Sequence, residues 1–406
     1  MSILVDYFRF LSKNRNFVMV LLWAFYLTSY LRGLLLKLPI VSSFTDIIIV
    51  LLISIPLIFS LPFFFKQPIV HKCIFIYFAL CTFYILNDVV YPENSAVLEK
   101  NLTRCLFTTF PFIIYGSLID IRKYFNAFYL TSIVCIALDA FYFLLFNKNG
   151  ISASGVESDH NMVAAYALLP HVLLCIVAAL RNFKVWKLLV AFAGSLMLVS
   201  YGTRGPIACF LVFMVSSLVL YRKSFSKTSV AVLIAVSILL LVFFNQIITV
   251  LVSVIGNKMG MSTRVLDLFL TNSIAVDEAR NQIIATLFDR LKYDHRVFGF
   301  GLLGSYNFTG GYPHNFFVDI LFSFGYLVGG LLLALLGIFS FKAFRISGIE
   351  EKSFFLVLFC SGFMHLLFSG TFVFEADFFI FLGFLIRLLN QTKPYEQTES
   401  LCKYRL

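Results

Sequence analysis

A histidine stands directly before a long apolar stretch, where it could accept a proton. His314 follows Gly310–Pro313 and precedes Asn315 and the apolar run that begins at Phe316. Because an imidazole takes up a proton near neutral pH, His314 is a candidate catalytic base. Asp319 stands one helical turn deeper on the same face and could orient or charge-stabilise the imidazole. The alternatives are a capping role for His314 and an ordinary hydrogen bond inside the bundle for Asp319.

Arginines at the ends of other apolar runs could bind an anion. Arg204 lies in the short turn SYGTRGPIACF between two apolar runs, and Arg280 opens an amphipathic stretch. A guanidinium presents a planar set of donors that matches phosphate oxygens, so both are candidates for a phosphate clamp. Snorkelling to lipid phosphates is the alternative for Arg204. Weaker candidates, which a solvated loop face explains equally well, are Arg264, Arg290 and Arg296.

Other polar residues in or beside apolar runs admit simpler roles. Asn161 is a candidate substrate contact, although Asp159 just before it is typical of a helix cap. Asp139 and His365 lie within apolar runs, where an ionisable residue is a functional hypothesis by default and interhelical hydrogen bonding is the simpler interpretation. The segment Gly299–Gly304 matches G-x-G-x-x-G, but it lacks the preceding strand that a dinucleotide site requires.

The composition indicates that these residues belong to a membrane protein. Of 406 residues, 60% are hydrophobic and 13% are charged, whereas a soluble domain has about 25% charged residues. The net charge is +11, from 32 Lys and Arg against 21 Asp and Glu. These values exclude a disordered protein, a disulfide scaffold and a soluble enzyme that binds nucleic acid.

Apolar runs long enough to cross a bilayer, which takes about 20 residues, recur along the chain. We therefore expect a single all-α domain over 1–406, a polytopic integral membrane bundle of about twelve transmembrane helices. The expected spans are 16–35, 46–65, 72–88, 104–120, 127–146, 162–180, 185–201, 205–221, 229–254, 316–341, 353–370 and 374–390.

The distribution of Lys and Arg tests this topology independently, because cytoplasmic loops are enriched in both. If the N-terminus is inside and the spans alternate, the inner segments hold 20 of the 32 Lys and Arg residues. Acidic residues show the opposite bias, with six inside and fourteen outside. Both termini are therefore expected in the cytoplasm.

Two segments outside the spans stand out. The segment 255–315, between the ninth and tenth spans, is by far the largest outer loop, and 391–406 is expected to be a cytoplasmic polar tail. Within the loop, 277–293 has apolar residues at helical spacing. That spacing predicts an amphipathic helix, which lies on the membrane surface, caps a cavity or packs on top of the bundle.

The cysteines show no pattern that carries chemistry. Seven of the eight lie in or beside apolar runs and one lies in the tail, so neither a disulfide framework nor metal-ligand spacing is indicated. No metal-protease, hydrolase or P-loop motif occurs. We expect no metal and no cofactor.

Four segments, in order and on the expected outer side, resemble motifs of one family of bacterial membrane enzymes. They are SGVESDHNMVAAYALLP (154–170), YGTRGPIACFLVF (201–213), EARNQIIATLFDRLKYDHRVFGFGLLGS (278–305) and PHNFFVDILFSFGYLVG (313–329). They are similar to segments of the O-antigen polymerase and ligase superfamily, which comprises Wzy-type polymerases and lipid A-core O-antigen ligases. The resemblance covers roughly residues 150–340. One departure is the pair Arg296 and Val297, which stands where the family usually has proline.

The resemblance implies a metal-independent, inverting glycosyltransferase of the bacterial inner membrane with a periplasmic active site. Its donor would be a glycan on undecaprenyl pyrophosphate. Arg204 and Arg280 would stabilise the pyrophosphate leaving group, and His314 would act as the base. Further substrate contacts are expected from Asn161, Arg264, Arg290, Asn315 and Asp319. The partners implied are the lipid-linked oligosaccharide, the bilayer, and a flippase and chain-length regulator of the same pathway, with no nucleic acid.

Three activities remain open at this point. A polymerase would transfer the chain to the non-reducing end of another lipid-linked repeat unit, and a ligase would transfer it to lipid A-core. A flippase for lipid-linked sugars would more often show an internal repeat and helices broken at mid-membrane. The sequence shows no repeat, and its polar residues gather at the outer ends of the spans. These features favour an enzyme, and we expect a polymerase.

Overall fold

The computed structural model describes residues 67–146, 156–182, 184–201, 203–222, 278–294 and 297–391, together with four single positions within 246–253. Over these residues the backbone is helical or forms turns and loops, and it contains no strand. Five of the helices are long and apolar enough to cross a membrane. The expected class, an all-α membrane protein, is confirmed at this level for the described part of the chain.

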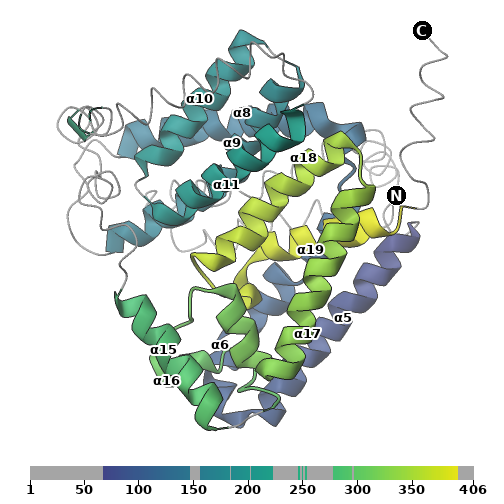
Figure 1. Cartoon of the computed structure of the whole chain (residues 1–406), viewed down its shortest axis with the longest axis vertical. Coiled ribbons are helices and arrows are strands. Elements are labelled where there is room, and N and C mark those ends of the chain that lie inside the picture. The colour runs from purple at the N-terminus through teal and green to yellow at the C-terminus, as the bar shows by residue number, and fades with distance from the viewer. Residues whose placement is uncertain are drawn as a thin grey trace, which may run out of the picture. The chain divides into compact units, whose positions relative to one another are not determined.

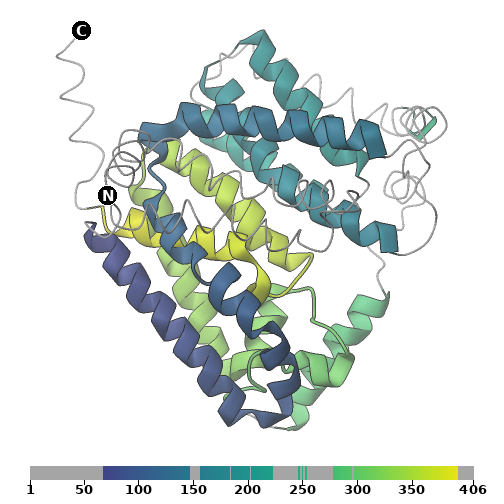
Figure 2. The same ribbon diagram turned by 180° about the vertical axis from the view of Figure 1, so that it is seen from behind.

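The chain divides into two compact units, and the elements of each can be followed in Figure 1 and Figure 2. The described helices of the first unit are α8 (Ile121–Phe146), which begins at its border, α9 (Val156–Arg181), α10 (Val185–Ser200) and α11 (Arg204–Tyr221). The second unit combines 62–122 with 277–406. Its main helices are α5 (Pro68–Val90), α6 (Ser95–Thr103), α7 (Phe112–Leu118), α15 (Glu278–Tyr293), α16 (Ser305–Thr309), α17 (Phe316–Ile346), α18 (Ile349–Leu358) and α19 (Ala376–Leu389).

Five of the expected spans coincide with helices of membrane-crossing length. These are α5, α8, α9, α11 and α17. The expected span 185–201 is also helical, as the shorter apolar α10. The runs 16–35 and 46–65 lie outside the described residues, as does nearly all of 229–254, and the count of twelve spans stays a prediction.

Of the remaining expected spans of the second unit, 374–390 is helical as α19 (Ala376–Leu389), whereas 104–120 and 353–370 are not single regular helices. In 104–120, a π-helical turn (Arg104–Thr109) and Pro111 separate α6 from α7. In 353–370, α18 passes into a π-helical turn (Phe359–Phe363) and a 3₁₀ turn (Met364–Leu367). Apolar composition predicted the extent of these segments but not their breaks, because a break depends on local hydrogen bonding.

Helices α7 and α19 approach each other at two glycines. A Cβ on Gly116 would overlap the carbonyl oxygen of Ile380, and a Cβ on Gly383 would overlap that of Ile113. Small residues of this kind let two helix backbones come into direct contact in a membrane protein. This pair forms the centre of the second unit, next to the buried side chains of α5 and α18.

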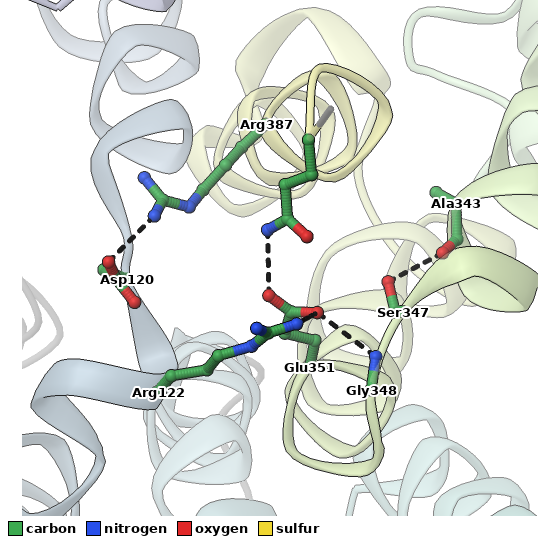
Figure 3. A network of polar contacts seen from close by, with 8 residues as sticks. Asp120, Arg122, Ala343, Ser347, Gly348, Glu351 and Arg387 are labelled. Atoms are coloured by element: carbon green, nitrogen blue, oxygen red, sulfur yellow. Dashed lines mark hydrogen bonds and ion pairs between the residues drawn. The ribbon is translucent and has the colours of Figure 1, made fainter. Parts of the chain in front are cut away.

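Figure 3 shows a network of polar contacts where α18 begins and α19 ends. The carboxylate of Glu351 accepts from Arg122 at 2.7 Å, from the Gly348 N–H at 3.2 Å and from Gln391 at 2.8 Å. Nearby, Arg387 pairs with Asp120 at 3.0 Å. All these positions fall in segments that the sequence predicts to lie on the inner side.

Buried polar pairs hold the helices of the first unit together. The Tyr201 hydroxyl donates to Asp139 at 2.6 Å, and Ser132 lies 3.1 Å from Nδ1 of His171. Asp139, Ser132 and His171 are fully buried. For Asp139, the interhelical hydrogen bond expected from the sequence is confirmed.

Candidate functional site at the start of helix α17

The loop before α16 is fixed to a break in helix α17. Gly325 has φ 75° and ψ 171°, which interrupts the helical path of α17. On the preceding turn, the Phe322 carbonyl accepts from the Phe300 N–H at 2.9 Å and the Ser323 carbonyl from the Gly301 N–H at 3.0 Å. The rings of Phe300 and Phe322 stack at 4.4 Å. The glycines of the G-x-G-x-x-G match therefore serve close packing, because a Cβ on Gly299, Gly301 or Gly304 would overlap a neighbouring residue.

Three asparagines attach the same loop to the corner between α5 and α6. Asn87 accepts from the Leu302 N–H at 2.8 Å. Asn94, which is fully buried, donates to the carbonyls of Phe300 at 2.8 Å and Leu302 at 3.2 Å. Its oxygen accepts from Asn307. Segments more than 200 residues apart in sequence are thus joined beneath the candidate site.

We expect that replacing Asn94 by leucine lowers the free energy of unfolding by about 2 kcal/mol, because the Phe300 and Leu302 carbonyls and the Asn307 amide each lose a hydrogen bond. The Asn307 amide keeps its bond to the Glu93 carbonyl. Asn101→Leu is the matched control, since among the described residues the Asn101 amide bonds within its own helix, to the Val97 carbonyl. Thermal unfolding in detergent measures both variants. Equal losses in the two would show that the loop does not depend on Asn94.

His314 occupies the turn that leads into α17. Its backbone is left-handed, with φ 49°, and its ring packs edge-on against Tyr312 at 5.0 Å. Nδ1 of the imidazole accepts a hydrogen bond from the Gly370 N–H at 3.3 Å. Asn315 caps α17, because its side chain accepts from the N–H groups of Phe317 and Val318. Asn315 thus has a structural role, and its expected contact with substrate stays a prediction.

Asp319 is buried and is tied to the same turn as His314. Its carboxylate accepts from the Thr371 hydroxyl at 2.6 Å, and its side chain is 2% exposed. Gly370 and Thr371 are consecutive, so His314 and Asp319 are held by neighbouring residues of one segment. This arrangement matches the alternative in which Asp319 is hydrogen-bonded inside the bundle.

Two charged residues that the sequence reasoning did not single out lie at this turn. Arg104 donates to the Phe374 carbonyl at 3.3 Å, and its guanidinium carbon lies 4.8 Å from the centroid of the Phe374 ring. Glu375 follows immediately and is part-buried. Burial raises the pKa of the Glu375 carboxyl to about 7, although the positive charge of Arg104 acts to lower it. The argument that selected Arg204, an arginine at the outer end of a span, applies equally to Arg104.

The amphipathic segment 277–293 forms helix α15, as its spacing predicts. Its apolar face is buried in the second unit, where Leu287 and Leu291 pack with Phe300, Val318 and Phe322. The helix therefore packs on the bundle. Two predicted site residues lie on it, half-buried Arg280 in its first turn and exposed Arg290 near its end.

The other predicted site residues are placed elsewhere. Arg204 is half-buried and begins α11 in the first unit, while Arg280 and His314 belong to the second, so their convergence stays a prediction. Asn161 lies on α9, with its side chain outside the described part, and Arg264 and Arg296 lie outside the described residues. Among the described residues, no group of three or more His, Cys, Asp or Glu could hold a metal ion.

Comparison with models of protein families, with curated proteins and with solved structures finds no match to this chain. The fold of the described residues defines the class of the chain as a helical membrane protein. What the candidate site can do is argued from the residues that form it.

Proposed function

We propose that this chain is a polymerase of a bacterial surface polysaccharide, in the manner of the O-antigen polymerases. It would transfer a glycan from undecaprenyl pyrophosphate to the non-reducing end of another lipid-linked repeat unit, at the periplasmic face of the inner membrane. The observation that carries the proposal is the grouping of His314, Arg104 and Glu375 around one turn at the start of α17.

The position of this group supports an activity at one membrane face. His314 directly precedes α17 (Phe316–Ile346), whereas Glu351, which pairs with Arg122, follows its other end. The His314 group and the Arg122–Glu351 network therefore lie at opposite ends of α17. Beyond the break at Gly325, the helical part 326–346 of α17 would measure about 30 Å as an ideal helix, which is the thickness of the hydrocarbon core of a bilayer. Because the network residues are predicted to be cytoplasmic, the His314 group would lie on the outer side, where lipid-linked repeat units are presented.

The residue types also suit the reaction. Transfer from a polyprenyl pyrophosphate needs cationic groups for the leaving group and a proton acceptor for the attacking hydroxyl. Arginines can provide the cationic groups for the pyrophosphate, and we assign this role to Arg204 and Arg280. A displacement of this kind needs no nucleotide sugar and would invert the anomeric configuration.

The surface glycan of a deletion strain tests the proposal. If the chain is a polymerase, its loss leaves core that carries a single repeat unit, and the cloned chain restores the long ladder. Core with no repeat unit, together with polymer on the lipid carrier, would instead identify a ligase. A strain whose lipid-linked units stay on the cytoplasmic face would identify a flippase.

A further inference from the structure

The hydrogen bond from Gly370 fixes which nitrogen of His314 can act on a substrate. Because Nδ1 accepts the Gly370 N–H at 3.3 Å, the proton of the neutral imidazole lies on Nε2. A base must have a free lone pair, and in this tautomer the nitrogen that faces away from Gly370 carries a hydrogen instead. His314 is therefore arranged as a hydrogen-bond donor through Nε2.

A carboxyl group lies beside the same glycine. A Cβ on Gly370 would come within 2.5 Å of Oε1 of Glu375, so this oxygen directly borders the residue whose N–H binds His314. Gly370 has φ 75°, a left-handed conformation in which a side chain is disfavoured. Because Gly370 has no side chain, the Glu375 carboxyl can lie next to the turn that binds the His314 imidazole.

The surroundings of Glu375 suit a group that both gains and loses a proton near neutral pH. Burial favours the neutral carboxylic acid, and the charge of Arg104 favours the carboxylate. Among the described residues, the titratable groups that face this turn include Arg104, Cys105, Tyr312, His314, Asp319, His365 and Asp377. The Cys105 thiol bonds to the Val373 carbonyl, and the Tyr312 ring packs against Phe374. Asp319, His365 and Asp377 are buried, and Asp319 is bonded to Thr371.

We infer that Glu375, rather than His314, accepts the proton of the attacking hydroxyl, and that His314 donates through Nε2 to the anionic pyrophosphate. This inference rests on the proposed function and deepens it, because it divides the two tasks between two residues. It replaces the role of base that the resemblance implied for His314.

The step balances as a single displacement. The acceptor O–H bond breaks and its proton moves to a carboxylate oxygen of Glu375, while the acceptor oxygen forms a bond to the anomeric carbon. The bond from that carbon to the phosphate oxygen breaks, and its electron pair leaves with the polyprenyl pyrophosphate. One negative charge thus passes from Glu375 to the leaving group, and the carboxyl later returns its proton to water.

The test uses the full-length chain in lipid nanodiscs, with polyprenyl-pyrophosphate-linked repeat units as both donor and acceptor. The initial rate of the wild-type chain should rise with pH through a midpoint near the pKa of Glu375, about 7, and then level off. Glu375→Gln keeps the shape of the side chain but cannot accept the proton. The rate of this variant should fall at least about 100-fold, and its pH dependence should no longer show this midpoint. Glu99→Gln, at an exposed carboxyl on α6, is the matched control and should behave as wild type.

Two further variants separate the proton acceptor from a merely structural role. Arg104→Gln removes a charge that favours the carboxylate, so the pKa of Glu375 rises and the midpoint of the rate moves to higher pH. His314→Gln keeps an N–H donor near the position of Nε2, so it should retain more activity than His314→Ala and keep the wild-type midpoint.

The outcomes are distinct. A Glu375→Gln variant that keeps the wild-type midpoint and a rate within about tenfold of wild type overturns the inference while the proposed function stands. Equal inactivity of His314→Gln and His314→Ala, with a normal Glu375→Gln profile, returns the role of base to His314. A wild-type chain that transfers nothing overturns both the function and the inference.

Discussion

Replacing Arg204, Arg280 or His314 by alanine is expected to abolish long-chain glycan while the chain stays folded and inserted. Each change removes donors that would stabilise the charge of a departing pyrophosphate. The loss of one such donor lowers a rate by about 100- to 1000-fold, which is enough to remove the upper part of a chain-length ladder.

The measurement is a gel of surface glycan from a deletion strain complemented with each variant, beside an immunoblot of the membrane fraction. Lys292→Ala is the matched control, because Lys292 is exposed near the end of α15, the helix that carries Arg280. Normal ladders from all three alanine variants would rule out this assignment of the site.

Hydropathy and charge were enough to predict most helices of the described part. The run 316–341 matches α17 (Phe316–Ile346), and 277–293 matches α15 (Glu278–Tyr293). These elements are set by local apolar periodicity, which is visible in sequence. The break at Gly325 was not predicted, because it exists only where the loop at Phe300 and Gly301 takes over the freed carbonyls.

The candidate site was predictable only in part, and for a physical reason. His314 and Asp319 were found because they lie five residues apart at the start of one apolar run. Glu375 and Arg104 were missed because they are about 60 and 210 residues from His314 and meet it only through tertiary packing. Their nearness depends on Gly370, whose φ of 75° cannot be read from its residue type alone.

Alanine at Gly116 or Gly383 is expected to destabilise the second unit by about 3 kcal/mol. The added methyl group at Gly116 would overlap the Ile380 carbonyl oxygen, and that at Gly383 would overlap the Ile113 carbonyl oxygen. Backbone atoms cannot rotate away as a side chain can, so α7 and α19 must separate and lose packing along their whole contact.

Gly330 and Gly337 on α17 provide matched controls, because a Cβ at either position meets no atom within 4 Å. Alanine there should stabilise the helix by about 0.5–1 kcal/mol, since glycine loses more backbone entropy in a helix. The free energy of unfolding is therefore expected to fall in one pair of variants and to rise in the other. The protein's own cysteines can report unfolding of the second unit, because Cys73, Cys105 and Cys360 are buried there as free thiols.

A thiol-reactive fluorescent dye added during heating in detergent gives the unfolding midpoint of each variant. We expect lower midpoints for Gly116→Ala and Gly383→Ala and unchanged or higher midpoints for Gly330→Ala and Gly337→Ala. If all four midpoints shift together, the effect is one of glycine content and α7 does not touch α19 through its backbone. If only the first pair falls, the backbone contact between α7 and α19 stabilises the second unit.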